Sequence, residues 1–559
     1  MSTNTSRRNF FKNTGAVSAA AMLGGVGVSA GLTACGGDSS ATPEDPLLAL
    51  TATQVVANIK NGTLKAETYM AAMIARAKAA SGLNAMIFLN EAEALKAAKA
   101  VDADKAAGKT LGALAGLPIV VKDNINTKDM KTTGGTPSLR NHQPKKNAPS
   151  VQKLIDAGAI VLGKSNLHEW AFGITSTNFT LGTDQTGAAA RPCKNPYDNS
   201  RIPGGSSGGT AVAVAARFAP AGLGTDTGGS TREPASFCGI AGFRPSVGNG
   251  AGNGRRYPDT VTDALPISTT RDTVGPMART VADIALLDAV ITGGTVPTAK
   301  ALKGLKIGIP SAFWAGLDDS VKPVAEAAKK KLADAGVVFV EATPTVDLTD
   351  IMKLNGAISF PIALHEPIHA IPAYFASADN APARTVKEIR DLVASPDVAG
   401  AFSFFNDDDL RIIDGKPAAP FNEANFHTAY VGIMGAGGGR ETLQNLYKDY
   451  FAKAGVECVL FPTTILAAPK IDVVKGSHTL SYTVGGVEQK DKDTFGTCIR
   501  NTDPCTNAGL PSLSIPAGLT AGGLPVGMEI DGPLGSDTNL LAIGMAIETV
   551  WGSLKAPAI

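Results

Sequence analysis

Residues 203–234 read Pro-Gly-Gly-Ser-Ser-Gly-Gly-Thr-Ala-Val-Ala-Val-Ala-Ala-Arg-Phe-Ala-Pro-Ala-Gly-Leu-Gly-Thr-Asp-Thr-Gly-Gly-Ser-Thr-Arg-Glu-Pro, two loops rich in glycine and serine joined by a segment of small residues. Glycine adopts backbone conformations that other residues avoid, and it lets other groups approach the main chain closely. Eight glycines around three serines therefore predict a backbone arranged around a small reacting group.

Two common uses of such loops do not fit this context. Residues 204–208, Gly-Gly-Ser-Ser-Gly, match the G-x-S-x-G pattern of a nucleophile elbow, which needs a strand leading into the serine. Residues 194–203 precede it instead with Pro, Asn and Asp, which are typical of a loop. A phosphate-binding loop is excluded as well, because neither loop contains the lysine that such a site requires.

A serine nucleophile needs a base, and none of the six histidines (142, 168, 365, 369, 427 and 478) lies within these loops. A buried, uncharged lysine can accept a proton in place of histidine. The segment Gly116-Leu-Pro-Ile-Val-Val-Lys122 is an apolar strand that ends in a lysine. Burial there would have to lower the lysine pKa from about 10.4 to near neutrality, a change of about 4 kcal/mol.

Several linked motifs then identify a family. Lys122 lies in Gly-Leu-Pro-Ile-Val-Val-Lys-Asp-Asn, and Ser206 and Ser230 are 24 residues apart (230 minus 206). Residues 163–170, Gly-Lys-Ser-Asn-Leu-His-Glu-Trp, precede the loops, and residues 237–245, Phe-Cys-Gly-Ile-Ala-Gly-Phe-Arg-Pro, follow them. Together these motifs resemble the amidase signature family with its Ser-Ser-Lys triad. The resemblance implies an α/β fold with a large, mixed, twisted sheet covered by helices on both faces.

The same resemblance implies a role for each triad residue. Ser230 would attack the amide carbonyl, and Ser206, preceded by a cis peptide bond, would relay its proton to Lys122. No metal or cofactor is expected. Asp226 and Arg232 are expected to brace the loops, and Glu233 stands where members of the family often carry an apolar residue. The implied oxyanion hole consists of the backbone N–H groups of Thr227, Gly228, Gly229 and Ser230.

The end of the chain narrows the expected substrate. Residues 500–504, Arg-Asn-Thr-Asp-Pro, resemble the branch of the family that hydrolyses indoleacetamide and mandelamide. We therefore expect a small, aryl-substituted carboxamide to be converted to an acid and ammonia. A peptide amidase or an N-acyl amide hydrolase is the alternative enzyme, and a catalytically inactive, ligand-binding lipoprotein is the alternative outside enzymes. The presence of all three triad residues argues against the inactive protein.

The first 35 residues carry targeting signals. Ser6-Arg-Arg-Asn-Phe-Phe-Lys12 and the apolar run 14–33 resemble a twin-arginine export signal, and Leu32-Thr-Ala-Cys35 resembles a lipobox. We expect Cys35 to carry the lipid that anchors the protein at the bacterial cell envelope, with residues 36–45 as a tether. An uncleaved membrane helix is the alternative, since the run is long enough to span a bilayer.

Residues 46–559 are expected to form a single catalytic domain, in which about 293–450 are the variable region around the substrate. The chain has 51 basic and 50 acidic residues, so its net charge does not favour binding to nucleic acid. Residues 182–194 look like extra chain, either a surface elaboration or a rim of the site. The sequence does not determine the oligomeric state. Predicted strands are Leu117–Val121, Ala159–Leu162, Leu305–Ile309, Val337–Val340 and Val456–Phe461, and predicted helices include Ser150–Asp156 and Val324–Ala335.

The remaining cysteines have separate interpretations. Cys238 and Cys458 lie in apolar segments and are expected to be buried thiols. Cys498 and Cys505 are seven residues apart, and a disulfide between them would be permitted outside the cytoplasm. Spacing alone does not decide that pairing, so it stays open at this point. If the pair forms, Cys193 is a spare thiol.

Overall fold

The computed structural model describes residues 45–176, 192–248, 254–376, 386–402, 412–413, 416–417, 423–472 and 479–559. The chain divides into one unit of residues Met1–Glu44 and one of Asp45–Ile559. The predicted export signal and Cys35 fall in the first unit, outside the described residues. Residues 182–191 of the predicted extra chain belong to the second unit and also lie outside the described residues. In the part that the structure describes, no helix is both long enough and apolar enough to cross a membrane.

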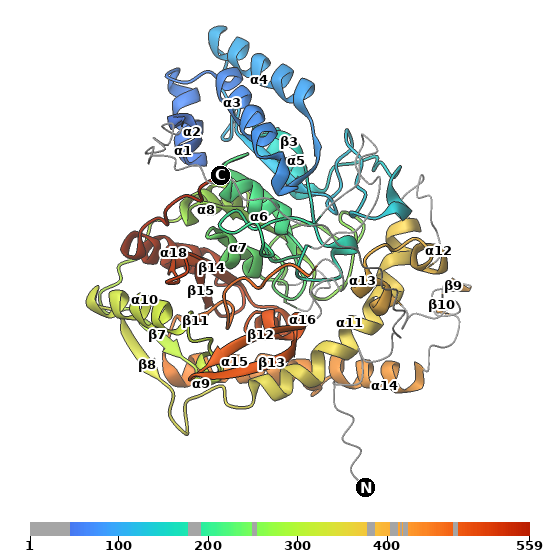
Figure 1. Cartoon of the computed structure of the whole chain (residues 1–559), viewed down its shortest axis with the longest axis vertical. Coiled ribbons are helices and arrows are strands. Elements are labelled where there is room, and N and C mark those ends of the chain that lie inside the picture. The colour runs from blue at the N-terminus through green and yellow to red at the C-terminus, as the bar shows by residue number, and fades with distance from the viewer. Residues whose placement is uncertain are drawn as a thin grey trace, which may run out of the picture. The chain divides into compact units, whose positions relative to one another are not determined.

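An eleven-stranded sheet runs through the unit Asp45–Ile559 (Figure 1). Pairing is parallel for β2–β3, β2–β4, β11–β7 and β7–β8 and antiparallel for the other neighbours, so the predicted mixed sheet and α/β class are confirmed. The strands, in their order across the sheet, are β1 (Met86–Leu89), β3 (Ile160–Ser165), β2 (Pro118–Lys122), β4 (Ala221–Asp226), β6 (Thr273–Ala278), β5 (Ala241–Arg244), β14 (Ser512–Leu519), β15 (Pro525–Asp531), β11 (Cys458–Pro462), β7 (Lys306–Ile309) and β8 (Val338–Glu341).

Two separate groups of helices pack on this sheet. The first group contains α5, α8, α10 and α18, and the second contains α6 and α7. The helices of the described residues are α1 (Pro46–Ala49), α2 (Ala52–Asn61), α3 (Ala66–Ala79), α4 (Glu91–Ala106), α5 (Pro149–Asp156), α6 (Gly208–Ala215), α7 (Arg232–Cys238), α8 (Val281–Thr292), α9 (Ser311–Trp314), α10 (Lys322–Asp334), α11 (Ile351–Ala376), α12 (Val386–Arg390), α13 (Pro396–Phe402), α14 (Glu423–Met434), α15 (Gly439–Ala454), α16 (Thr494–Cys498), α17 (Asp503–Ala508) and α18 (Asp537–Trp551).

Strand β14 explains why the two faces of the sheet differ. Successive side chains of a strand point to opposite faces, and the sequence Ser512-Leu-Ser-Ile alternates polar and apolar residues. Leu513 and Ile515 lie against α18, where a Cβ added to Gly544 would be 2.3 Å from Leu513 Cδ2. Ser512 and Ser514 point to the opposite face, and Ser512 Oγ there donates to Glu529 of β15 at 2.8 Å. This polar face is the one covered by α7.

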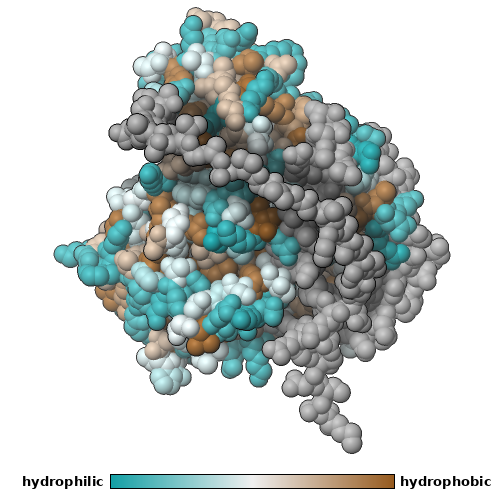
Figure 2. Space-filling view, viewed as in Figure 1, coloured by the Kyte–Doolittle hydropathy of each residue, from teal (hydrophilic) through white to brown (hydrophobic). Residues whose placement is uncertain are grey.

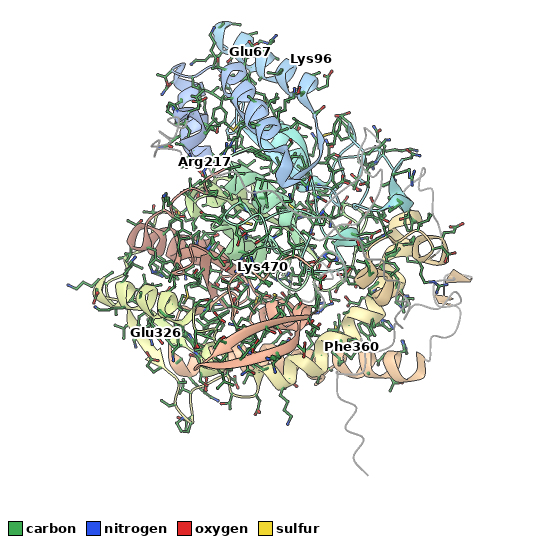
Figure 3. The ribbon with its side chains drawn as sticks, in the orientation of Figure 1. Glu67, Lys96, Arg217, Glu326, Phe360 and Lys470 are labelled. Atoms are coloured by element: carbon green, nitrogen blue, oxygen red, sulfur yellow. The ribbon has the colours of Figure 1, made fainter. Side chains whose placement is uncertain are left out.

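Local sequence signals set the helix ends at the start of the unit. Thr51 accepts the Gln54 N–H, and the Gln54 side chain accepts the Thr51 N–H, a capping box that starts α2. Gly62, at φ 85°, ends α2 in the left-handed conformation that glycine adopts readily. Charged residues of α3 and α4 such as Glu67 and Lys96 extend from the outer surface of these helices (Figure 3).

Residues 347–450, in the predicted variable region, contain one long helix. Helix α11 runs for 26 residues, Ile351–Ala376, with Pro361, Pro367 and Pro372 inside it. A proline removes one hydrogen bond and crowds the preceding turn, so propensity alone would end the helix. Packing against α15 and α17 keeps α11 helical through its three prolines. Small strand pairs complete the described structure: β9 (Ile412–Ile413) with β10 (Lys416–Pro417), and β12 (Thr479–Val484) with β13 (Val487–Asp493).

Hydrophilic and hydrophobic residues are intermixed over the described part of the face shown in Figure 2. The large apolar side chains are instead concentrated around the sheet, where the main hydrophobic cluster joins strands β2, β4, β14 and β15 to the helices α8 and α18. The sheet is therefore a rigid support for the loops that leave its strand ends.

Candidate active site

Lys122 is the last residue of β2, a strand whose five residues are all buried. Its Nζ atom lies 2.7 Å from Ser206 Oγ and 2.8 Å from Thr225 Oγ1. Thr225 belongs to β4, the parallel neighbour of β2, and Asn124 Nδ2 also donates to its Oγ1 at 3.0 Å. The structure thus brings Lys122 and Ser206 together as predicted, and it adds two polar partners that the sequence did not indicate.

The surroundings of Lys122 disfavour its charge. Burial lowers its pKa well below the ordinary value, although the negative charges of Asp226 and Asp272 act in the opposite direction. An uncharged amine has a lone pair with which it can accept a proton from a neighbouring hydroxyl. Lys122 therefore has the environment that a lysine base needs.

A second buried lysine, Lys164 of β3, has a different environment. Its Nζ atom donates to Ile125 O at 2.7 Å and to the hydroxyls of Thr127 and Thr132, and it lies 3.5 Å from Asp123 Oδ1. Burial lowers its pKa to about 8. These contacts fasten the loop after β2, so Lys164 is a structural lysine that supports the position of Lys122.

The loop of Ser206 has the predicted cis peptide bond between Gly205 and Ser206. The Ser206 carbonyl accepts the His168 N–H at 3.1 Å. The next residue, Ser207, fixes the loop to β4, because its Oγ lies 3.2 Å from both the N and the O of Thr225. Ser206 is thereby held on the side of the strand end from which Lys122 emerges.

The loop of Ser230 connects β4 to α7. Asp226, the last residue of β4, accepts the N–H groups of Gly229 at 3.0 Å and Thr231 at 3.2 Å. The Ser230 carbonyl accepts the Ser207 N–H at 3.2 Å, which joins the two serine loops directly. Ser230 itself is 6% exposed, so its hydroxyl lies in a nearly closed environment.

The hydrogen bonds of this loop bear on the predicted oxyanion hole. The Gly229 N–H already donates to Asp226, so it is committed to holding the loop. The N–H groups of the other three predicted residues, Thr227, Gly228 and Ser230, have no acceptor among the described residues, so they stay available for a ligand oxygen. Gly229, at φ 132°, also leaves no room for a side chain, since a Cβ would be 2.1 Å from Thr502 Oγ1.

The two catalytic candidates are not yet in direct contact. Within the described residues, no hydrogen bond joins the hydroxyls of Ser206 and Ser230. Catalytic hydrogen bonds are often long in structures without substrate and shorten when the substrate binds. The geometry therefore presents the Lys122–Ser206 pair already formed and the contact with Ser230 still open.

A buried ionic network braces the Ser230 loop, as the sequence predicted for Asp226 and Arg232. Arg232 donates to both oxygens of Asp226 at 3.0 Å and to Glu529 at 2.5 Å, and Arg244 donates to Asp226 at 3.1 Å. Burial raises the pKa of Asp226, but the two guanidinium groups outweigh it and hold the pKa below its ordinary value. With both arginines charged, the cluster is neutral when Glu529 and Asp531 share one proton.

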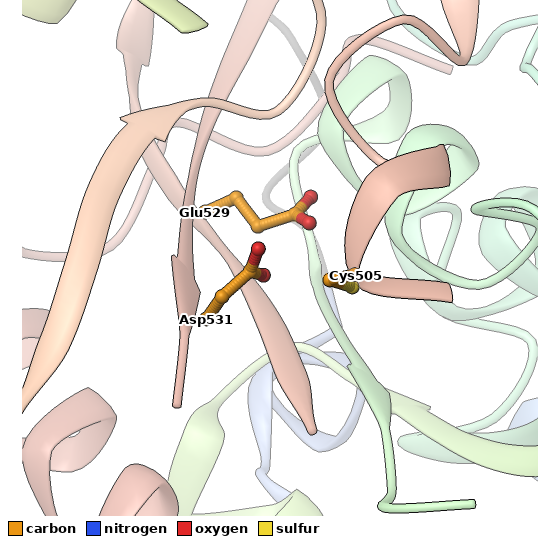
Figure 4. A group of neighbouring side chains, drawn as sticks. All are labelled: Cys505, Glu529 and Asp531. Carbon is orange, nitrogen blue, oxygen red and sulfur yellow. The ribbon is translucent and has the colours of Figure 1, made fainter. Parts of the chain in front are cut away.

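Cys505, Glu529 and Asp531 have ligand atoms within 4.8 Å of one another, the one metal-ligand grouping of this kind among the described residues (Figure 4). Arg232 Nη1 already lies 2.5 Å from Glu529 Oε1 and 3.2 Å from Cys505 Sγ. A divalent cation there would have to bind beside a fixed guanidinium charge in a fully buried position. We therefore interpret this cluster as a structural network with arginine as its cation.

All five cysteines of the described residues are free and buried. Cys498 packs in a cluster with Phe237 and Ile499, whereas Cys505 lies in another cluster, beside Arg232. The disulfide that the sequence left open is thus not formed. Cys238 and Cys458 are buried thiols, as expected.

The family model described as Amidase matches residues 69–363 and 416–541. The chain belongs to the amidase signature family. An indoleacetamide hydrolase of Agrobacterium vitis is 41% identical over 479 residues, 85% of this chain and 91% of the relative. A mandelamide hydrolase of Pseudomonas putida is 36% identical over 519 residues, 92% of this chain and 94% of the relative.

A solved structure of an amidase is also similar to this chain. The peptide amidase of Stenotrophomonas maltophilia superposes with a TM-score of 0.69 at 27% identity, covering 91% of this chain and 98% of the peptide amidase. This member of the amidase signature family is thus an enzyme that hydrolyses amide C–N bonds. The resemblance inferred from the motifs around Lys122, Ser206 and Ser230 is confirmed at the level of the family.

Proposed function

We propose that the protein is an exported amidohydrolase that cleaves a small, aryl-substituted carboxamide through an acyl-enzyme on Ser230, releasing ammonia and a carboxylic acid. The observation that carries this proposal is the contact of 2.7 Å between Lys122 Nζ and Ser206 Oγ in a fully buried site. A neutral lysine in contact with a serine hydroxyl is the base that the two glycine-rich loops would otherwise lack.

The chemistry rests on two contacts of Lys122 Nζ, with Ser206 Oγ at 2.7 Å and with Thr225 Oγ1 at 2.8 Å. When the amine is uncharged, it can donate one N–H to Thr225 Oγ1 and accept the proton of Ser206 with its lone pair. Ser206 Oγ then takes the proton of Ser230 Oγ as that oxygen bonds to the amide carbon. Asp226 keeps the Ser230 loop in place for this attack.

Breakdown of the tetrahedral intermediate uses the same groups in reverse. The carbonyl oxygen, now negative, accepts the N–H groups of Gly228 and Ser230, and preorganised amides of this kind are worth about 3–4 kcal/mol each in acyl transfer. Lys122 returns its proton through Ser206 to the nitrogen, the C–N bond breaks, and ammonia leaves. A water molecule deprotonated by the same pair hydrolyses the acyl-enzyme and regenerates Ser230.

The substrate class rests on relatives and on the surroundings of the glycine loop. The two relatives with 41% and 36% identity carry names for hydrolases of aryl-substituted primary amides. Helix α11, in the predicted substrate region, reaches the site through Asn355, which donates to Asp503 Oδ2 at 2.7 Å. Asp503 Oδ1 lies 3.5 Å from the point where a Cβ on Gly228 would be. An acceptor in that position suits a primary amide nitrogen.

Ammonia release from a panel of amides tests the proposal in the full-length protein. Arylacetamides are expected to be hydrolysed faster than peptide amides and fatty amides. Ser230→Ala and Lys122→Ala are expected to lower kcat/KM by at least about 10³-fold. Activity of Ser230→Ala at the wild-type rate would contradict the acyl-enzyme, and faster hydrolysis of peptide amides would favour the alternative substrate class.

Export and anchoring are a separate part of the proposal. The twin-arginine segment and Cys35 support it, and both lie outside the described residues. In a bacterial host, Cys35→Ser is expected to shift the protein from the membrane fraction to the soluble fraction without changing its specific activity. Membrane association that survives both this change and treatment at high salt would instead support an uncleaved helix.

A further inference from the structure

Glu233 is a buried carboxyl group in the first turn of α7, three residues after Ser230. Its Oε2 atom accepts the N–H of Gly205 at 2.7 Å, directly before Ser206. Its own backbone N–H donates to Gly229 O at 2.8 Å, directly before Ser230. One residue therefore connects the loops of both catalytic serines, through its side chain to the first and through its main chain to the second.

The Ser206 loop is shaped to receive this carboxyl group. Gly204, at φ 81°, is in the left-handed region that favours glycine, and a Cβ there would be 2.4 Å from Glu233 Oε2. A side chain at position 204 would thus displace the carboxyl oxygen from the Gly205 N–H. Glycine at this position and glutamate at 233 form a matched pair.

Burying the Glu233 carboxyl group costs the folded protein stability. Its second oxygen, Oε1, is buried and has no hydrogen-bond partner among the described residues. Burial raises its pKa well above the ordinary value, and the titratable groups that sense its charge are the thiols of Cys238 and Cys498. An apolar side chain would avoid this cost of burying a polar group. Proteins typically keep a destabilising residue of this kind only at a site that serves function.

We propose that Glu233 is a positioning residue that holds the Ser206 loop beside the Ser230 loop, so that the proton relay can form when substrate binds. The proposal rests on the function proposed above for Ser206 and Ser230. Glu233 touches neither substrate nor a reacting atom in this account, and it acts through the main chain of Gly205. A displacement of about 1 Å at a reacting group can lower a rate by about 10²-fold.

The test compares Glu233→Ala with Glu233→Gln in the full-length protein. The alanine variant is expected to lower kcat about 10- to 100-fold with KM changed less than about twofold, because the relay is disturbed and the substrate contacts are not. Glutamine keeps an acceptor oxygen for the Gly205 N–H and is expected to restore kcat to within about fivefold of wild type. The rate at which a fluorophosphonate probe labels Ser230 is expected to follow kcat in both variants.

Glu548 supplies a matched control on α18. Its carboxyl group accepts the Val281 N–H at 3.0 Å, and burial raises its pKa to about 7, but it contacts neither serine loop. Glu548→Ala is expected to lower the unfolding temperature while kcat stays within about twofold of wild type. If Glu233→Ala does not fold, Glu233→Met, which fills the space without an acceptor, takes its place in the same assay.

Three results would overturn the proposal: a wild-type kcat in folded Glu233→Ala, a change in KM alone, or a glutamine variant as slow as the alanine variant. These differ from failure of the proposed function itself. If the proposed function is wrong, Ser230→Ala keeps its activity. If only the Glu233 proposal is wrong, Ser230→Ala is inactive and the Glu233 variants lack the expected effect.

Discussion

Thr225→Val tests the electrostatic setting of the lysine base. The change keeps the shape of the side chain and removes the oxygen that accepts from Lys122 at 2.8 Å and from Asn124 at 3.0 Å. A hydrogen bond to a charged group contributes about 1.5–3 kcal/mol and one between neutral groups about 0.5–1.5 kcal/mol. Lys122 gains its proton on the way to the transition state, so the variant loses the difference, about 1–1.5 kcal/mol.

This free energy corresponds to a fall in kcat of about 5- to 12-fold. KM is expected to stay within about twofold, because the hydroxyl that is lost already bonds to Lys122 and Asn124, beside a small cavity of about 20 Å³ that Thr225 lines together with Asn124 and Thr227. Steady-state ammonia release at saturating arylacetamide measures the change, and Thr225→Ser, which keeps the hydroxyl, is the control. A valine variant with wild-type kcat, or a serine variant as slow as valine, would refute the reasoning.

Three further predictions concern ionisation and stability. Because burial lowers the pKa of Lys122, kcat/KM is expected to fall as pH decreases through that pKa and to be constant above it; a pH–rate profile that rises toward acid would contradict a lysine base. Arg232→Met is expected to lower the free energy of unfolding by about 3–5 kcal/mol in urea, because buried Glu529 loses its arginine partner and Asp226 keeps only Arg244, whereas Arg201→Met at a half-exposed pair is expected to cost less than about 1 kcal/mol. Burial raises the pKa of Glu529 to about 8, so the stability that its protonated form provides is complete below the pKa of the unfolded chain, near 4.5, and is lost as pH rises toward 8; Glu529→Gln is expected to flatten that slope, and an unchanged slope would exclude Glu529 as its source.

Five of the eleven strands were predicted, because short apolar runs bounded by turn residues leave few alternatives. The predicted strand Leu117–Val121 is β2, Pro118–Lys122, and Val456–Phe461 corresponds to β11, Cys458–Pro462. Helix α11 was not predictable from local propensity, since Pro361, Pro367 and Pro372 interrupt the pattern and its stability comes from burial against other helices. Contacts between distant segments override local preference there.

Some features of the site could be predicted from sequence motifs, and others depend on the folded sheet. Lys122, Ser206 and Ser230 lie in motifs, so the sequence marked them individually. Thr225 and Asn124 lie in the same quoted stretches, but their contact with each other could not be predicted, because it depends on the register in which Val121 of β2 pairs with Leu223 of β4. That register is a property of the folded sheet, and no motif records it. The Cys505 thiol is free and contacts Arg232, and this contact could not be predicted for the same reason.

The most direct test of the central claim is to identify the serine that becomes acylated or phosphonylated. The full-length protein is treated with an aryl fluorophosphonate, in which a serine oxygen bonds to phosphorus as fluoride leaves, and the modified peptide is located by mass spectrometry. The account predicts a single adduct on Ser230, slowed strongly in Lys122→Ala and absent in Ser230→Ala. An adduct on Ser206, or equal labelling in the Ser230→Ala variant, would contradict it.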